Sequence, residues 1–545
     1  MLGFFLTHYP TCNGGHRDRL SPMNSTFPAP DIPFTPISDL LLSHARREAS
    51  KPALYDLDAQ RGISWGELDA EASRIANRLE EIGTRSGDRV ALLAEGGLEM
   101  LMLWTGLWRL GAVVVPLHPE MSEDSLVRAV ALVAPKLVLW SSDWPKPQLL
   151  ERLKAPRIRI GRWSAEGDAR DAFFAELAAT SAEARARPAV EPGDIAAIFC
   201  TSGTTALPKI VVADHLAFWM TGLSEIDIMG LSAADRTLEY RSFSWNSAQV
   251  MSLMPWLQLG LTLHVARKFS RSRFFGWIKR HDITFSVTVP TVIRMLLNRP
   301  VAVSAADLPS LRHMTCSSAP LDERSWRDFE ARYGIKLVVC YGTSEAGSVC
   351  GNRPDRRKIG TVGFPSKHQQ FEIVDRGGNP CPPGVEGEVT CGGPQLCRGL
   401  IEADGSLARV AGGRYRTGDV AVMDEEGFVR ITGRIKDLII RGGVNIAPLE
   451  IDQVLLQHPA VYEAAALGVP DPIYGEEVVA YVVPRDGAAP AASDLLGHCR
   501  ARLGAFKSPK RVYIVSEIPK SGRGKVMRDA LRARWLRERG AAGGG

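Results

Sequence analysis

The sequence predicts an α/β protein with a large N-terminal domain of parallel sheets flanked by helices, a β-rich subdomain, and a small, mobile α+β C-terminal domain. Three observations support this fold class. From about residue 36 to 370, helical periodicity alternates with short apolar runs, which is typical of parallel strands covered by helices. Between about 370 and 435, strand-like runs are separated by Gly and Pro. After residue 435, helical and strand patterns mix over about a hundred residues, enough for a small domain.

The predicted elements follow in that order along the chain. We expect amphipathic helices at 37–46 and 65–82, and buried strands at 89–94, 112–115, 136–140, 261–266, 283–287 and 335–340. The β-rich part should contain strands at 370–374, 387–391 and 428–432. The last part should contain helices at 447–458 and 492–503 and strands at 464–469, 477–484 and 511–515. The predicted divisions are a leader without fixed structure (1–35), an N-terminal domain (36–435), a C-terminal domain (436–536) and a flexible tail (537–545).

Composition and charge argue against several classes of protein. The 545 residues are 45% hydrophobic and 23% charged, as in ordinary globular proteins. The 66 Lys and Arg exceed the 61 Asp and Glu by five, and the basic residues are scattered, whereas nucleic-acid binding favours a concentrated basic stripe. The nine Cys form no C-x-x-C pair, which favours reduced thiols and a cytoplasmic protein.

The most apolar stretch, residues 98–117, is not expected to span a membrane. Arg109, Gly111 and Pro116 interrupt it, and it divides better into a helix ending near Leu110 and a buried strand. The N-terminus lacks the basic region of a signal peptide, and Met23 is a plausible alternative start. The sequence leaves both a monomer and a homodimer open.

The first segment that carries chemistry is FCTSGTTALPKI, residues 199–210, which directly follows an apolar strand. Its small and hydroxylated residues offer backbone N–H groups and hydroxyls, and Lys209 adds a positive charge. A polyphosphate needs all three. The Gly-Lys-Ser/Thr ending of a Walker A loop is absent. Taken alone, this segment is compatible with a phosphate-binding loop and with an ordinary Ser/Thr-rich turn.

Two further segments place carboxylates at predicted strand ends. VCYGTSEAG, residues 339–347, contains Glu345, and a carboxylate beside hydroxyls can hold a hydrated Mg²⁺ that bridges phosphate oxygens. A solvated loop Glu is the alternative. YRTGD, residues 415–419, ends in Asp419, a natural acceptor for two ribose hydroxyls. The series continues with GRIKD at 433–437, RGGVNIAP at 441–448 and PKSGRGK at 519–525.

The order and spacing of these segments are far more specific than any one of them. Together with ISWGELDAEASRIANRL at 63–79, GDRVALL at 87–93, RLGAVVVPLHP at 109–119 and SSAPL at 317–321, they resemble the adenylate-forming (AMP-binding) superfamily, in its acyl-CoA synthetase and CoA ligase branch. The resemblance runs from about residue 36 to 535. It implies ATP, Mg²⁺ and coenzyme A, a carboxylic acid substrate, and a place in fatty acid metabolism.

The resemblance also implies catalytic roles for three residues. Lys525 would contact the carboxylate and the α-phosphate during adenylation, and Glu345 would bind Mg²⁺. Lys436 would act as the hinge between the two domains. The absent side chain of Gly443 would leave room for the pantetheine arm of coenzyme A.

Nucleotide binding is implied for a larger set of residues. Asp419 would bind the ribose, with Arg434 nearby, and Tyr341 would stack on adenine. The remaining positions that match the family's nucleotide-binding motifs are Thr201, Ser202, Gly203, Thr204, Thr205, Lys209, Ser318, Ala319, Pro320, Gly342, Thr343 and Ser344.

Two regions depart from the family's pattern. Ala206 and Ile210 stand where the phosphate loop usually has Gly, so a required positive φ would strain them by roughly a kcal/mol or more. A stiffer loop is the other interpretation. The segment RSFSWNSAQ, residues 241–249, replaces the usual Phe/Tyr-His, with Ser244 or Trp245 in the His place.

That second segment bears on the identity of the acid. Amino-acid-activating domains place an Asp after the Phe, but Ser244 follows Phe243 here, so a buried ammonium would lack its counter-charge. Phe243, Trp245 and Val289 are expected to line an apolar pocket that suits a medium-chain or aromatic acid. Arg241 could bind a second carboxylate, although a surface position is the expectation for this Arg.

The sequence therefore predicts an AMP-forming acid–CoA ligase that works through an acyl adenylate. Because Lys525 must reach the α-phosphate and then leave before a thiol approaches the same carbonyl, the C-terminal domain is expected to take two arrangements about Lys436. Two alternatives remain open: transfer of the acyl group to a carrier protein, and a non-catalytic nucleotide-binding regulator.

Overall fold

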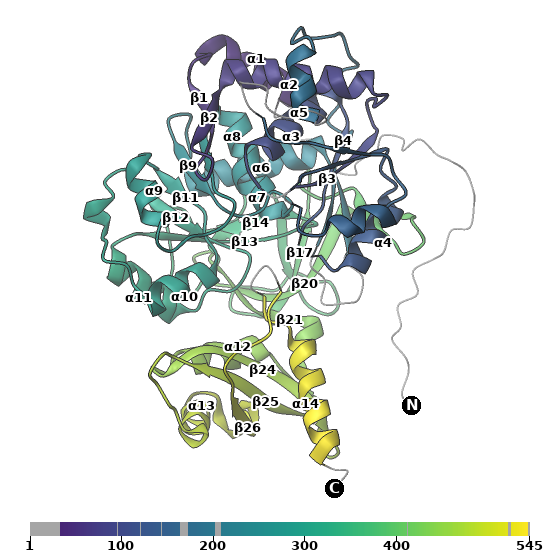
Figure 1. Ribbon diagram of the computed structural model, residues 1–545. Helices are drawn as coiled ribbons and strands as arrows, with labels where there is room; N and C mark the ends of the chain where they lie inside the picture. Colours follow the sequence, from purple (N-terminus) through teal and green to yellow (C-terminus); the bar gives the residue numbers. More distant parts are fainter. Residues whose placement is uncertain are drawn as a thin grey trace.

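The computed structural model describes residues 33–542, except 95, 120, 143, 164–172, 202–208, 411–412 and 522–524. Its architecture confirms the predicted fold class, with two helix-flanked sheets rich in parallel strands, a smaller antiparallel sheet, and an α+β unit at the C-terminus (Figure 1). In this view, the C-terminal unit lies below the rest of the molecule as a separate body. Most of the predicted leader lies outside the described residues.

The first large sheet has nine strands in the order β15-β14-β13-β12-β11-β9-β10-β1-β2. The six strands from β13 to β1 run parallel, so their carboxyl ends open along one edge. The strand bounds are β1 Pro52–Asp56, β2 Arg61–Ser64, β9 Arg236–Glu239, β10 Thr262–Val265, β11 Phe285–Ser286, β12 His313–Cys316, β13 Leu337–Thr343, β14 Gly347–Gly351 and β15 Phe364–Pro365. Ligands of open α/β sheets bind at such an edge.

The second large sheet has eight strands in the order β19-β18-β8-β7-β4-β3-β5-β6. Its bounds are β3 Arg89–Leu93, β4 Val113–Pro116, β5 Leu137–Trp140, β6 Arg157–Arg159, β7 Ile195–Cys200, β8 Ile210–Asp214, β18 Gly399–Ile401 and β19 Leu407–Arg409. The strands from β7 to β6 are parallel. β18 and β19 lie within the chain segment predicted to be a β-rich subdomain, but they extend this sheet by pairing with β8.

Helices cover both large sheets. They are α1 Ile37–Glu48, α2 Trp65–Glu81, α3 Leu98–Leu110, α4 Glu123–Val133, α5 Phe173–Glu176, α6 His215–Met229, α7 Asn246–Ala248, α8 Met254–Leu259, α9 Phe274–Arg280, α10 Pro290–Asn298 and α11 Glu323–Tyr333. Between α7 and α8, a π-helix, η3, runs over Gln249–Leu253. Short 3₁₀ turns occupy Pro147–Arg152, Leu177–Ala179 and Ala305–Asp307.

The apolar stretch 98–117 divides as predicted. Helix α3 ends at Leu110, Gly111 turns the chain with a φ of 76°, and strand β4 follows. Nearly every residue of α3 is buried in the main hydrophobic core, which explains why the stretch is apolar all round. In the part of the chain that the structure describes, no helix is both long and apolar enough to cross a membrane.

The third sheet is antiparallel, with the strand order β16-β17-β20-β21. Its strands are β16 Gln370–Val374, β17 Gly387–Gly392, β20 Arg414–Met423 and β21 Val429–Arg434. Side chains on β20 alternate between buried and more exposed positions, so Tyr415, Thr417 and Asp419 share one face. Figure 1 shows β20 and β21 leading down to the C-terminal unit.

The C-terminal unit begins at the 3₁₀ turn Ile435–Asp437 and has its own sheet and hydrophobic cores. Its elements are β22 Ile439–Arg441, β23 Val444–Ile446, α12 Pro448–Leu456, β24 Val461–Asp471, β25 Gly475–Pro484, α13 Ala492–Lys507, β26 Arg511–Ile514 and α14 Arg528–Ala542. The β22–β23 hairpin and α14 were not predicted from the sequence. Helix α14 extends into the segment that was predicted to be a flexible tail.

Candidate active site

Asp419 is the centre of the first cluster of predicted site residues. It is 6% exposed on β20, directly opposite Arg434 on β21, whose Nε lies 2.5 Å from Asp419 Oδ1. Tyr341, on β13, donates its hydroxyl to Asp419 Oδ2 at 2.6 Å. The first large sheet and the antiparallel sheet therefore meet at this carboxylate. The three predicted residues lie together.

The charge of Lys525 also reaches Asp419. Burial raises the pKa of Asp419 above its usual value, while Arg434, the Tyr341 hydroxyl and the charge of Lys525 lower this pKa. Burial likewise raises the pKa of Tyr341, and the neighbouring Asp419 carboxylate raises it further. A lysine from the C-terminal unit thus contributes to the electrostatics of a buried carboxylate in the rest of the molecule.

Lys525 is fixed to the C-terminal unit by backbone contacts. Its carbonyl accepts the Ser521 N–H at 2.9 Å, and its own N–H donates to Ser521 Oγ at 3.3 Å. Just after it, Arg528 donates from Nε to the Ala466 carbonyl at 3.0 Å and pairs with the buried carboxylate of Asp452. Any motion of the C-terminal unit as a body therefore carries Lys525 with it.

Glu345 forms the second cluster. It is 7% exposed at the turn between β13 and β14, and its Oε1 lies 3.2 Å from Lys209 Nζ. Tyr415, on β20, hydrogen-bonds to the same carboxylate, and burial together with the Glu345 charge raises the pKa of Tyr415. The lysine of the predicted phosphate loop and the predicted metal ligand are therefore neighbours.

Tyr415 is a functional candidate that was not predicted from the sequence. It is the first residue of the YRTGD segment, and it shares a strand face with Asp419. The period-two alternation of a strand was the signal that could have found it, because Asp419 fixes which face of β20 points into the site.

The predicted phosphate loop is described only at its ends. Ser202, Gly203, Thr204, Thr205 and Ala206 lie outside the described residues. Thr201 donates its N–H to the Lys209 carbonyl at 2.8 Å, which closes the base of the loop. Ile210 is buried in β8 and has no positive φ, so the strain considered for this position does not arise.

The predicted adenine-binding segment follows β12 at the same sheet edge. Ser317 is buried, and its N–H donates to the Thr288 carbonyl at 3.3 Å. Ser318 has a φ of 73°, which is strained for a residue with a Cβ, and such positions concentrate at functional sites. Ala319 and Pro320 follow Ser318 directly in the chain. On the neighbouring segment, Gly342 and Thr343 end strand β13, and Ser344 comes immediately after it.

The predicted acid-pocket residues differ in burial. Phe243 is 1% exposed and belongs to the main core, while Val289 is half-buried. Trp245 is also half-buried and stacks on His118, with 5.0 Å between the ring centroids. Arg241 was predicted to lie on the surface, and this prediction is wrong. Its side chain is buried, with 4% of the residue exposed, because it forms an ion pair with the fully buried Glu239.

Two hydrogen bonds between described residues join the C-terminal unit to helices α10 and α11. Asn298 Nδ2 donates to Asp486 Oδ2 at 3.2 Å, and Arg324 Nη1 donates to the Gln457 carbonyl at 3.1 Å. Arg299 also pairs with Asp486 at 3.8 Å, and an exposed ion pair of this kind contributes little stability. Lys436 lies in the exposed 3₁₀ turn that follows Arg434, and Gly443 lies in the two-residue turn between β22 and β23 with a φ of 82°.

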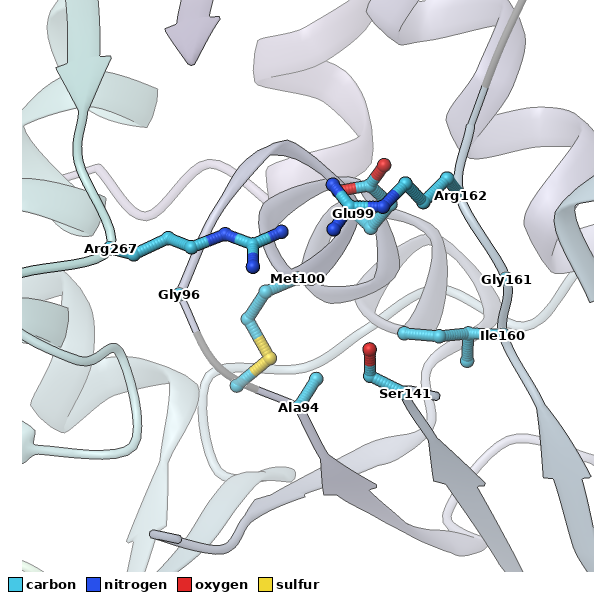
Figure 2. A pocket seen from close by; sticks show the side chains of 9 residues that line it. All are labelled: Ala94, Gly96, Glu99, Met100, Ser141, Ile160, Gly161, Arg162 and Arg267. Atoms are coloured by element: carbon cyan, nitrogen blue, oxygen red, sulfur yellow. The ribbon is translucent and has the colours of Figure 1, made fainter. Parts of the chain in front are cut away.

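A separate hollow opens at the carboxyl ends of β3, β5 and β6. Figure 2 shows Arg162 and Arg267 extending toward it from opposite sides, with Glu99 and Ser141 between them. It continues into a basic depression of about 320 Å³ that also includes Lys268. Among the residues that the structure describes, no predicted site residue lines either part.

Comparisons with known proteins identify the family of the chain. The model of the AMP-binding enzyme family matches residues 41–401, and that of the AMP-binding enzyme C-terminal domain matches residues 450–525. Sulfoacetate–CoA ligase of Cupriavidus necator is 33% identical, covering 91% of this chain and 97% of its own length. Indoleacetate–CoA ligase of Aromatoleum aromaticum is 30% identical, with the same two coverages. The ATP-bound crystal structure of MatB from Rhodopseudomonas palustris superposes with a TM-score of 0.83 at 27% identity, covering 91% of this chain and 99% of that one.

Proposed function

The chain belongs to the AMP-binding enzyme family, and on that premise we propose that it joins a carboxylic acid to coenzyme A, converting ATP to AMP and pyrophosphate. In the first step, a carboxylate oxygen of the acid attacks the α-phosphorus of ATP, and pyrophosphate leaves. In the second step, the thiol sulfur of coenzyme A attacks the carbonyl carbon of the acyl adenylate, and AMP leaves with the bridging oxygen.

The observation that carries this proposal is the convergence of Tyr341, Arg434 and the charge of Lys525 on Asp419. A carboxylate at a sheet edge can accept both ribose hydroxyls of ATP, and we assign the adenine ring to the face of Tyr341. We assign Lys525, whose charge reaches Asp419, to the α-phosphate. Its charge offsets the repulsion between the acid carboxylate and the phosphate oxygens, and it stabilises the charge of the transition state.

No general base is needed for the first step, because a carboxylic acid is already ionised at neutral pH. The chain's contribution is to bring two anions together and hold them in line. We assign the phosphates of ATP to the loop from Thr201 to Thr205, with Lys209 contributing its charge. The segment from Ser317 to Pro320 is assigned to the adenine.

Glu345 fits a role as the magnesium ligand. Mg²⁺ prefers oxygen ligands and usually takes one or two carboxylates, with substrate phosphates and water completing its shell. Among the described residues, no group of three His, Cys, Asp or Glu could hold a metal by itself. A single buried carboxylate beside Lys209 matches an ion that arrives with the nucleotide. When bound, Mg²⁺ would neutralise negative charge on the phosphates.

We assign the rotation between the two steps to the C-terminal domain, residues 436–536, with Lys436 as its hinge. The position of Lys525 near Asp419 suits adenylation. Rotation would withdraw Lys525 and bring up the turn at Gly442 and Gly443, where absent side chains leave space for the pantetheine arm. The weak contacts to α10 and α11 would not oppose this movement.

For the acid, we propose a medium-chain or aromatic carbon skeleton packed against Trp245 and Val289. The relative named for indoleacetate acts on an aromatic acid. The relative named for sulfoacetate acts on a short acid with a second anionic group.

One experiment tests the proposed function. Pyrophosphate release is measured across a panel of carboxylic acids, with and without coenzyme A, and the acyl product is identified by mass. We expect acyl-CoA and AMP in equal amounts. Adenylation without transfer to coenzyme A would favour a carrier protein as acceptor, and no release with any acid would favour a nucleotide-binding regulator.

A further inference from the structure

A group of buried charges lies where β9 ends, beside the predicted acid pocket. Nε of Arg241 lies 3.0 Å from Oε1 of Glu239, and Nη2 lies 2.7 Å from Oε2. Glu239 also accepts hydrogen bonds from the N–H groups of Tyr240 and Arg241 and from Ser252 Oγ, at 2.9, 2.8 and 2.7 Å. The carboxylate of Glu239 is thus fully used, and it holds the guanidinium in a fixed orientation.

Nη1 of Arg241 takes no part in that pairing. Its described partner is the thioether sulfur of Met251 at 3.7 Å, and sulfur is a weak acceptor. The same sulfur accepts the Ser317 hydroxyl at 3.3 Å, so a single side chain separates Arg241 from the predicted adenine segment. Met251 lies in the π-helix η3, and π-helices occur frequently at functional sites. Met side chains adapt easily to new neighbours, so an anionic oxygen could replace this sulfur.

Glu225, on α6, completes the group. It is 3% exposed, and its charge interacts with that of Arg241. Its Oε2 has no hydrogen-bond partner among the described residues. Burial raises the pKa of Glu225 to about 7, so a large share of this carboxyl is protonated at neutral pH. A protonated carboxyl donates a hydrogen bond to a nearby anion instead of repelling it.

A buried ion pair is costly unless its remaining donors and acceptors are satisfied. Here Arg241 Nη1 and Glu225 Oε2 are both poorly satisfied, and Arg241 lies two residues before Phe243 in the segment predicted to line the acid pocket. We propose that the acid substrate carries a second anionic group, a carboxylate or a sulfonate, which Arg241 binds through Nη1. Glu239 acts as the positioning residue for Arg241, and Glu225 faces the bound anion in its protonated form.

This inference rests on the proposed ligase activity and narrows its substrate class. The carbon skeleton between the two acidic groups still packs on the apolar surfaces of Trp245 and Val289. The second acidic group takes the place of the Met251 sulfur beside Arg241. Suitable substrates are therefore dicarboxylic or sulfonated acids with an apolar or aromatic spacer.

The test compares α,ω-dicarboxylic acids with monocarboxylic acids of equal carbon number, from malonate and propionate to suberate and octanoate. kcat/KM is measured for the wild type and for Arg241→Lys, which keeps a charge for Glu239 but loses the planar fork. Arg109→Lys is the matched control, because Arg109 is also buried and paired, with Asp69 Oδ1 2.5 Å from its Nη2.

At the best chain length, we expect the wild type to prefer the dicarboxylate by roughly 100-fold, since the monocarboxylate would leave a buried donor unpaired. Arg241→Lys should abolish this preference by lowering kcat/KM for the dicarboxylate, and Arg109→Lys should leave the preference unchanged. A wild type that prefers monocarboxylates at every length would overturn the inference and leave the ligase function intact. A preference that survives in Arg241→Lys would assign Arg241 a structural role only.

A binding measurement tests the second anionic group separately from the ligase activity. Protection of the wild type against thermal unfolding by a dicarboxylate, lost in Arg241→Lys, supports the inference even if no acid is turned over with coenzyme A. Equal protection by dicarboxylate and monocarboxylate contradicts it. Complete absence of turnover with every acid, by contrast, contradicts the proposed function itself.

Discussion

Replacing Glu225 with Gln should change how the stability of the protein depends on pH. Glu225 is buried near Ser348 on β14, Arg241 after β9 and Cys340 on β13. Burial raises the pKa of Glu225 from 4.5 to about 7, whereas an ion pair that stabilises a carboxylate lowers its pKa. Gln keeps the size of the side chain but cannot titrate.

The sign follows from proton binding. Because the pKa is raised on folding, the folded state holds this proton more tightly than the unfolded state does. The stabilising contribution is therefore complete below pH 4.5 and is lost as the pH rises through about 7. Raising a carboxyl pKa by this amount corresponds to about 3 kcal/mol of unfolding free energy. The wild type should lose this amount between pH 4.5 and 8, and Glu225→Gln should not.

The assay is urea unfolding followed by tryptophan fluorescence at pH 5, 6.5 and 8. The unfolding free energy of Glu225→Gln minus that of the wild type should rise by about 3 kcal/mol across this range. Glu323→Gln is the control, because the Glu323 side chain on α11 is 57% exposed, and its difference from the wild type should stay flat. A difference for Glu225→Gln that does not change with pH, or that falls as the pH rises, would refute the reasoning.

Three further predictions address the two half-reactions and the pocket. Lys525→Ala should lose adenylation but still convert supplied acyl-AMP and coenzyme A to thioester. Lys436→Pro should restrict the hinge, and it should keep adenylation but lose thioester formation. Equal loss of both steps in both variants would contradict the two arrangements of the C-terminal domain. Tyr415→Phe removes a hydrogen bond to Glu345 and should raise the Mg²⁺ requirement of adenylation about fivefold, as measured by a Mg²⁺ titration; an unchanged requirement would separate Tyr415 from the metal. Trp245→Ala should shift relative kcat/KM toward wider or longer acids by ~1–3 kcal/mol; an unchanged acid profile would remove Trp245 from the pocket.

Local patterns predicted most of the fold because apolar periodicity and turn residues act at short range. The alternation of helical periodicity with apolar runs predicted the parallel sheets. Gly111 predicted the position at which the apolar stretch 98–117 divides into a helix and a strand. The β22–β23 hairpin was missed because its strands are only three residues long, too short to display a period. The pairing of β18 with β8 was missed because it joins segments about 190 residues apart, which no local pattern encodes.

The candidate site was likewise predicted only in part from the sequence. Tyr341, Asp419 and Arg434 were found through their motifs, and the structure brings all three together. Arg241 was expected on the surface because most Arg are exposed, and its burial depends on Glu239, whose pairing was not recognised from the sequence. Whether a charge can be buried is decided by its partners in three dimensions.

The central claim is that the reaction passes through an acyl adenylate, and oxygen transfer tests it most directly. The enzyme is supplied with an acid that it accepts, labelled with ¹⁸O in the carboxylate, together with ATP, Mg²⁺ and coenzyme A. The oxygen that attacks the α-phosphorus stays on the phosphate when the thiol displaces AMP. We predict one ¹⁸O atom in each AMP formed and none in pyrophosphate. Thioester formation with unlabelled AMP, or with the label in pyrophosphate or inorganic phosphate, would contradict the account.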